Sequence, residues 1–109
     1  MITRLWRGWT APEHANAYHR FLLNELFPAM GSIPGFLGAD VMRRRDGDEV
    51  AFVTLTRFDS LDAIRAFAGE DYEMPVLEPQ ALALVSHYED RAEHFETSSF
   101  RPSREPPPA

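Results

Sequence analysis

The sequence predicts one α+β domain in which a four-stranded antiparallel sheet is covered on one face by helices. Three observations predict it. The chain has 109 residues, which suits a single domain. Segments with strand-like alternation and segments with helical apolar spacing follow one another along it. An Asp46-Gly47 pair, typical of a tight turn, joins two adjacent strand-like segments as an antiparallel hairpin.

The chain begins with a predicted strand followed by a long helix. Residues 2–9 are rich in β-branched and aromatic side chains and alternate, as strands do. Thr10 and Glu13 have the spacing of a capping box, and Pro12 fits the first helical turn. Pro28 is expected to bend or end the helix at the preceding residue. The apolar face of this helix recurs at three- and four-residue spacing: Tyr18, Phe21, Leu22, Leu26 and Ala29.

The middle of the chain predicts a hairpin and a second helix. Residues 36–45 and 48–58 are expected to be the two hairpin strands. Asp59 or Ser60 is expected to cap the second helix, and Gly69 to end it. The buried stripe of this helix is expected to comprise Leu61, Ile64, Phe67 and Ala68.

The last third of the chain completes the topology. Residues 79–87 predict a short third helix, and residues 91–97 a last strand. The main elements then have the order β-α-β-β-α-β of a ferredoxin-like fold. We therefore expect one domain over residues 1–97, followed over residues 98–109 by a proline-rich disordered tail.

Alternation along the strands predicts which side chains face the helices. The small aliphatic side chains of the third strand are expected beneath the helices: Ala51, Val53 and Leu55. The opposite face would then show large apolar side chains: Trp6, Phe36, Met42, Phe52 and Phe58. Such a face is unfavourable in water, so we expect a second copy to cover it about a two-fold axis and to close a dimeric α+β barrel.

Composition disfavours several classes of function. The chain has no cysteine, so we expect no disulfide, thiolate metal site or cysteine nucleophile. Its net charge of −6 disfavours binding to nucleic acid or to an anionic membrane. The N-terminus lacks the apolar core of a signal peptide, and no stretch has the length of a membrane span, so we expect a cytoplasmic protein.

Histidine and arginine side chains supply the candidates for chemistry. His94 has the strand parity that would place it beside Trp6, where a neutral imidazole can take a proton from an acidic phenol or enol. The alternative is a structural or interface histidine. Arg4, on the same face, would either hold a substrate oxyanion or form an ion pair with Asp40. His87 would either cap the short helix or contact a ligand. The histidines lack metal-binding spacing, so we expect no metal site.

Three segments resemble the antibiotic biosynthesis monooxygenase (ABM) family of the dimeric α+β barrel superfamily: residues 2–10 (ITRLWRGWT), 52–60 (FVTLTRFDS) and 61–69 (LDAIRAFAG). The resemblance implies a homodimer with a pocket in each subunit. Some relatives oxidise aromatic polyketides or quinols with molecular oxygen and no cofactor, and others degrade haem. The haem-degrading relatives use a first-strand asparagine, which is missing here, and only His87 lies near their haem-ligating histidine. We therefore expect no haem and no other cofactor.

Two hypotheses follow. The first is a cofactor-independent monooxygenase acting on a small aromatic or quinol-like molecule, with His94 as base and Arg4 as oxyanion holder. Its substrate would contact Trp6, Phe36, Phe52, Phe58, Tyr88 and His87. The second is a non-catalytic dimeric barrel that binds a small hydrophobic ligand or has a structural role.

Overall fold

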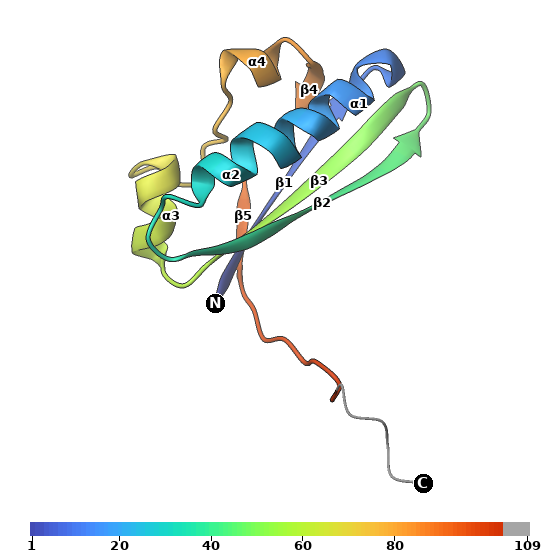
Figure 1. Ribbon diagram of the computed structural model, residues 1–109. Helices are drawn as coiled ribbons and strands as arrows, with labels where there is room; N and C mark the ends of the chain where they lie inside the picture. The colour runs from blue at the N-terminus through green and yellow to red at the C-terminus, as the bar shows by residue number, and fades with distance from the viewer. Residues whose placement is uncertain (104–109) are drawn as a thin grey trace, which may run out of the picture.

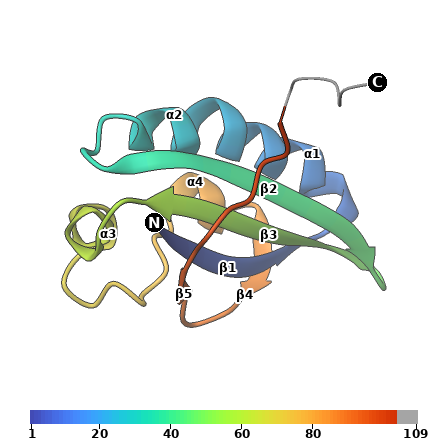
Figure 2. The same ribbon diagram turned by 90° about the horizontal axis from the view of Figure 1, so that it is seen from below.

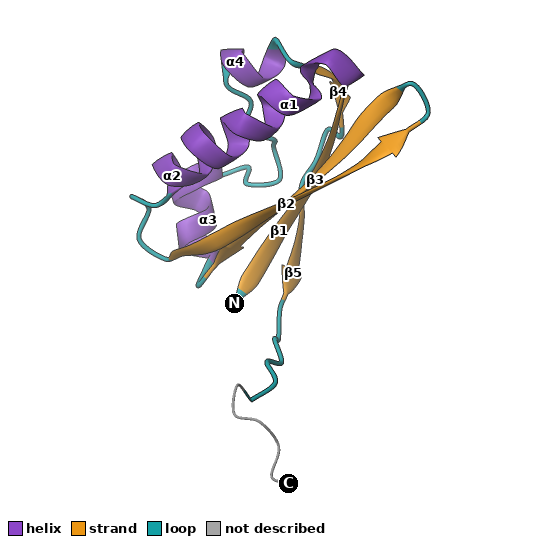
Figure 3. Cartoon of the chain, turned by 45° about the vertical axis from the view of Figure 1, so that its right-hand side comes forward, coloured by secondary structure: helices purple, strands orange, loops and turns teal. Residues whose placement is uncertain are grey.

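The computed structural model describes residues 1–103, and it has the predicted architecture of helices packed on an antiparallel sheet (Figure 1). The helices lie on one side of the sheet, as the edge-on view shows (Figure 3). In chain order the elements are β1 (Ile2–Thr10), α1 (Pro12–Phe21), η1 (Leu22–Leu26), α2 (Phe27–Met30), β2 (Phe36–Asp46), β3 (Glu49–Phe58), α3 (Leu61–Ala68), α4 (Pro79–Leu82), β4 (Val85–Tyr88) and β5 (Glu93–Glu96).

The sheet has the strand order β2-β3-β1-β4, with β5 on the same edge of β1 as β4 (Figure 2). All of its pairings are antiparallel, and the sheet is not closed within one chain. The strand predicted over residues 91–97 is present as β5, and β4 is an additional short strand formed largely from residues predicted as the third helix. β4 pairs with residues 8–10 of β1, and β5 pairs with residues 2–5. The helix predicted over residues 79–87 ends at Leu82, because the segment after it joins this sheet edge.

Pro28 was predicted to bend or end the long helix, and it does not end it. The helix continues through a π-helical turn at η1 into α2, which ends at Met30. The ring of a proline normally clashes with the carbonyl four residues earlier. Hydrogen bonds in a π turn reach five residues back, which widens the helix ahead of Pro28 and relieves that clash. We call the continuous helix α1-η1-α2 the rod.

The two predicted helix caps have different outcomes. Ser60 caps α3, since its Oγ accepts a hydrogen bond from the backbone N–H of Ala63 at 3.1 Å. The capping box at Thr10 does not form. The N-cap of α1 is Ala11, and Thr10 is instead the fully buried last residue of β1. Its Oγ1 is the single buried side-chain nitrogen or oxygen of residues 1–103 without a hydrogen-bond partner.

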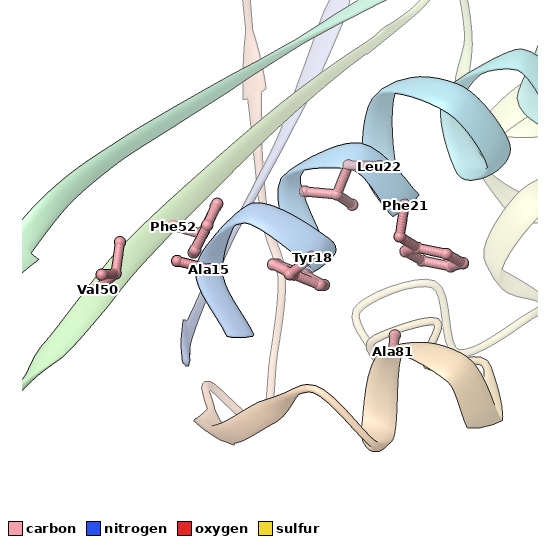
Figure 4. Packing of buried hydrophobic residues seen from close by; sticks show 7 residues of the cluster. All are labelled: Ala15, Tyr18, Phe21, Leu22, Val50, Phe52 and Ala81. Carbon is pink, nitrogen blue, oxygen red and sulfur yellow. The ribbon is translucent and has the colours of Figure 1, made fainter. Parts of the chain in front are cut away.

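The predicted faces of the sheet are inverted. Trp6, Phe52 and Phe58 are 9%, 1% and 0% exposed in one chain and pack beneath the helices. Tyr18 of α1 meets Phe52 edge-on, with 4.9 Å between ring centroids (Figure 4). Strand β3 carries apolar residues on both faces. Alternation along it therefore does not say which face the helices cover. Large rings fill the gap between a rod and a sheet better than small aliphatic side chains do. The open face therefore shows the smaller set: Ala51, Val53 and Leu55.

A register shift in β2 explains a related error. Phe36 and Met42 have the same sequence parity and were predicted to share a face. The pairing with β3 shifts between Phe36 and Gly38, and Gly38 has φ +139°. Phe36 therefore pairs with Phe58 on the helix-covered face, whereas Met42 is 50% exposed on the open face.

The C-terminal end of the described chain has no regular structure. Residues 98–103 form neither helix nor strand, and the rest of the predicted tail, residues 104–109, lies outside the described residues. Within residues 1–103, no helix combines the length and the apolar character needed to cross a bilayer.

Candidate functional site

A small cavity lies between the rod and the helix-covered face of the sheet. Its volume is about 40 Å³. One wall comes from β1 and β3, another from the rod, and the rest from α3, α4 and the segment before α4. The lining residues are Arg4, Trp6, Thr54, Thr56, Tyr18, Phe21, Leu22, Leu26, Phe27, Met30, Phe67, Pro75, Val76, Leu77, Glu78 and Ala81. Figure 4 shows Tyr18 and Phe21 on the rod opposite Ala81 of α4. The cavity is thus largely apolar, with Arg4 as its buried cation.

Arg4 is 4% exposed and is held by neutral acceptors. Its Nη1 donates to the carbonyl oxygen of Tyr72, and its Nη2 donates to that of Met74 at 2.8 Å. The guanidinium carbon lies 5.6 Å from the ring centroid of Phe67, in cation–π geometry. Both carbonyls belong to residues 69–78, the segment between α3 and α4, which we call the loop.

No carboxylate neutralises Arg4 within the described chain. The ion pairs among residues 1–103 do not include Arg4. Its predicted partner, Asp40, instead pairs with Arg57 at 2.6 Å. Glu78, which also lines the cavity, is exposed. Burial lowers the pKa of Arg4 to about 10, so the guanidinium still carries its charge at neutral pH. An unpaired buried cation is costly, which distinguishes this site from an ordinary core.

His94 contacts Arg4 but does not itself line the cavity. It is paired with Arg4 in the β1–β5 register. Both side chains lie on the same face of the sheet as Trp6, which is the face predicted for His94 from its position along the strand. Its Nε2 lies 3.1 Å from Nη1 of Arg4. Burial lowers the pKa of His94, and the charge of Arg4 lowers it further, while the charge of Glu73 opposes them. The imidazole is therefore neutral at neutral pH, and its Nε2 can accept the Arg4 hydrogen bond.

Trp6 and Tyr18 provide the aromatic walls of the cavity. The indole Nε1 of Trp6 donates to the carbonyl oxygen of Glu89 at 2.8 Å, so it is already satisfied. Burial raises the pKa of the Tyr18 phenol to about 12, so this hydroxyl stays protonated and cannot serve as a base at neutral pH. Both side chains can pack against a flat ligand without supplying a charge.

The other residues proposed as substrate contacts lie elsewhere. Phe52 and Phe58 belong to the core clusters, and Phe36 packs on Phe58 with 5.6 Å between ring centroids. Tyr88 lies beyond Trp6, at 5.8 Å between centroids, and does not line the cavity. His87 lies apart from it, stacked on Trp9 at 4.4 Å and hydrogen-bonded to Glu49 at 2.8 Å.

Patterns in the sequence did not predict that the rod and the loop form walls of the site. The helical spacing of the rod was recognised, but it was interpreted as core packing. Residues 75–78 carried no recognisable signal. Of the predicted site residues, the structure brings together Arg4, Trp6 and His94. It shows no cluster of three or more potential metal ligands within residues 1–103.

Comparison with known proteins supports the fold. No curated protein matches the sequence. SnoaB, a cofactor-independent oxygenase from Streptomyces nogalater, is 23% identical, with a TM-score of 0.60 over 94% of this chain and 97% of its own. The monooxygenase from the ActVA-Orf6 gene of Streptomyces coelicolor, solved with nanaomycin D, is 15% identical, with a TM-score of 0.57 over 94% and 92%. MhuD, a haem-degrading protein from Mycobacterium tuberculosis solved with two haems bound, is 19% identical, with a TM-score of 0.58 over 94% and 100%.

The sequence itself identifies the family. The profile of the antibiotic biosynthesis monooxygenase family matches residues 1–73, which run from β1 through α3 and into the loop that carries the carbonyl of Tyr72. This match covers well over half of the chain. The chain therefore belongs to the antibiotic biosynthesis monooxygenase family.

Proposed function

We propose that this protein is a cofactor-independent monooxygenase that oxidises a small aromatic or quinol-like molecule in the Arg4 cavity. One observation carries the proposal: a charged, buried guanidinium without a carboxylate partner borders an apolar cavity. Cofactor-free oxygenation passes through an anion of the substrate, and a fixed cation in a water-poor site stabilises that anion strongly. The oxygenases among the structural relatives make this reaction class the first to test.

Anthrone illustrates the reaction. Loss of one proton from its CH₂ group gives an enolate, whose oxygen would face Arg4. The carbanion form of this enolate donates an electron to O₂, and the two fragments combine at the same carbon. One oxygen atom becomes the second carbonyl of anthraquinone, and the other leaves as water with the two hydrogens of the original CH₂. Carbon, hydrogen and oxygen balance without a cofactor.

His94 is the proposed base. In the observed arrangement its Nε2 is engaged with Nη1 of Arg4. A substrate oxyanion that draws the guanidinium into the cavity would free this nitrogen. The lowered pKa of His94 keeps the ring uncharged, so it is able to accept a proton at neutral pH.

We also propose a homodimer formed through the open face of the sheet. The expectation rested on Trp6 and Phe52, but those side chains are buried in one chain. Other apolar residues now support it: Leu37, Met42 and Phe95 are 54%, 50% and 47% exposed. They belong to β2 and β5, on the face that the helices leave uncovered. A two-fold partner would cover them and leave the Arg4 cavity on the outer side of each sheet.

Oxygen uptake tests the proposed activity. The protein is mixed with anthrone or with a dihydroxynaphthalene in air-saturated buffer, and oxygen is followed with an electrode. We expect uptake by the wild type, a loss in Arg4→Met and a loss in His94→Ala. Arg20→Met and His14→Ala change exposed residues of the same types and serve as matched controls. Binding of these molecules without uptake would favour the second hypothesis, a non-catalytic barrel.

A further inference from the structure

We propose that Arg4 is a latch that couples the binding of an aromatic anion to the opening of the loop, so that the site selects aromatic carboxylates and enolates over neutral molecules of the same shape. The inference rests on the proposed function for the location of the ligand, but not on turnover. It concerns how the cavity opens and which ligand opens it.

The cavity must enlarge before any aromatic molecule can enter. Its volume of about 40 Å³ has room for only a few water molecules, each of which takes about 10–15 Å³ on this measure. A cavity that binds benzene, by comparison, has a volume of roughly 150 Å³. One of the walls therefore has to move.

The loop is the wall that can move. The rod and the sheet are joined by buried clusters that include Phe21, Leu22 and Phe52. The loop has no helix or strand, yet its Pro75, Val76 and Leu77 line the cavity. Segments with little buried surface and few backbone hydrogen bonds are the first to open.

Arg4 provides two of the bonds that hold the loop closed. These are its hydrogen bonds to the carbonyl oxygens of Tyr72 and Met74. Two other bonds tie the loop to the segment before β5: the N–H of Ala92 donates to the carbonyl of Glu73 at 2.7 Å, and Arg91 pairs with Asp71 at 2.8 Å. The Asp71–Arg91 pair is exposed and contributes little. The Arg4 bonds are thus the polar link between the loop and the cavity floor, and they act beside the packing of Tyr72 on His94, at 5.1 Å between ring centroids.

An anionic ligand can replace these carbonyls, whereas a neutral ligand cannot do so at equal cost. A carboxylate accepts two parallel hydrogen bonds from a guanidinium and neutralises its charge. Two carbonyls accept hydrogen bonds from Arg4 but leave the buried charge uncompensated. Exchange of carbonyls for a carboxylate therefore releases the loop at the moment when the ligand needs the space. A ligand shifts such an equilibrium only through its different affinity for the two states, and Arg4 supplies that difference.

A matched pair of probes tests the latch. We would measure by calorimetry the binding of 2-naphthoate, which is ionised at neutral pH, and of its neutral isostere 2-naphthamide. The wild type should bind the carboxylate roughly tenfold or more tightly than the amide, as hydrogen bonds to a charged partner imply. Arg4→Met should bind both with about equal affinity, and Arg4→Lys should keep part of the preference. Equal affinities in the wild type would overturn the proposal.

Hydrogen exchange of the Ala92 amide reports the opening separately. Because this N–H is bonded to the loop at Glu73, its exchange should speed up when 2-naphthoate saturates the wild type. In Arg4→Met it should be fast without a ligand, whereas Arg20→Met should behave as the wild type does. Slower exchange with 2-naphthoate bound would overturn the latch. Carboxylate preference without oxygen uptake would refute the proposed function alone, and oxygen uptake without that preference would refute the latch alone.

Discussion

Arg4 and His94 face each other across the β1–β5 pairing, with Nη1 of the guanidinium 3.1 Å from Nε2 of the imidazole. The contact joins the first strand to the last one, and of the two residues Arg4 lines the cavity. A neutral histidine accepts this hydrogen bond, whereas a protonated one repels the arginine. The protonation of His94 therefore determines how firmly Arg4 is held.

This relationship predicts a pH dependence of stability. The pKa of His94 is lower in the folded chain than in the unfolded chain, so the unfolded state takes up a proton first as the pH falls. The free energy of unfolding should therefore decline below about pH 6.5 and level off once the lowered folded pKa has been passed. Urea unfolding of the wild type and of His94→Gln at pH 7.5 and 5.5 measures this, with His14→Gln as the control. An equal decline in His94→Gln and in the wild type would contradict the assignment.

Removal of the Arg4 side chain should loosen the loop more than the fold. Arg4→Met takes the donor away from the carbonyls of Tyr72 and Met74, but it leaves an unbranched apolar side chain in the core. The loop contains Glu70, Glu73 and Glu78, all exposed, so a glutamate-specific protease can report its opening. We expect faster cleavage there in Arg4→Met than in Arg20→Met, with an unfolding midpoint in urea that changes little. Equal cleavage rates would show that Arg4 does not restrain the loop.

Thr10 offers a stabilising substitution. Its hydroxyl is fully buried and lacks a partner, so Thr10→Val removes an unsatisfied polar group and keeps the shape of the side chain. The free energy of unfolding should rise by about 1 kcal/mol. Thr3→Val is the matched control, because Thr3 shares a hydrogen bond with Thr97, and its loss should be destabilising. If both variants are destabilised, Thr10 has a partner in solution.

Gly35 should tolerate a side chain less well than Gly47. Both have positive φ, at +92° and +60°. A Cβ on Gly35 would overlap Oδ1 of Asp59 and lie 2.9 Å from Cβ of Ala63, whereas a Cβ on Gly47 would meet nothing within 4 Å. Gly47→Ala should therefore cost only the conformational term of about 1 kcal/mol, and Gly35→Ala clearly more. Thermal unfolding of the two variants compares them, and equal losses would contradict the close packing at Gly35.

The open face predicts the assembly. Light scattering coupled to size exclusion should give the mass of two chains for the wild type. Leu55→Asp places a charge on the open face and should give the mass of one chain, with the near-ultraviolet signal of the Tyr18–Phe52 core unchanged. Ala66→Asp, on the exposed side of α3, should remain a dimer. A wild type that elutes as a single chain would refute the dimer.

Local signals made the fold predictable. The turn at Gly47 and the cap at Ser60 each depend on neighbouring residues, and both are found. Pro28 is also a local signal, but the π turn that accommodates it leaves no mark in the sequence. The choice of the buried face depends on whether the rod packs on rings or on small side chains, which alternation does not encode.

The site was predictable only in part, because its key contacts are distant and involve the backbone. Arg4 was a candidate because a guanidinium inside the predicted barrel needs a partner, either a carboxylate or a substrate oxyanion. Its partners are carbonyl oxygens 68 and 70 residues away, and every residue type carries a carbonyl. No side-chain pattern identifies them, so an ion pair with Asp40 was the natural but wrong expectation.

The ionisation of a bound phenol tests most directly whether Arg4 stabilises a substrate oxyanion. 4-Nitrophenol turns yellow as it ionises, so its absorbance can be titrated in the presence of saturating protein. The account predicts that the bound probe ionises at a lower pH than the free probe, and that Arg4→Met abolishes the shift. A probe that ionises at a higher pH when bound to the wild type would contradict it.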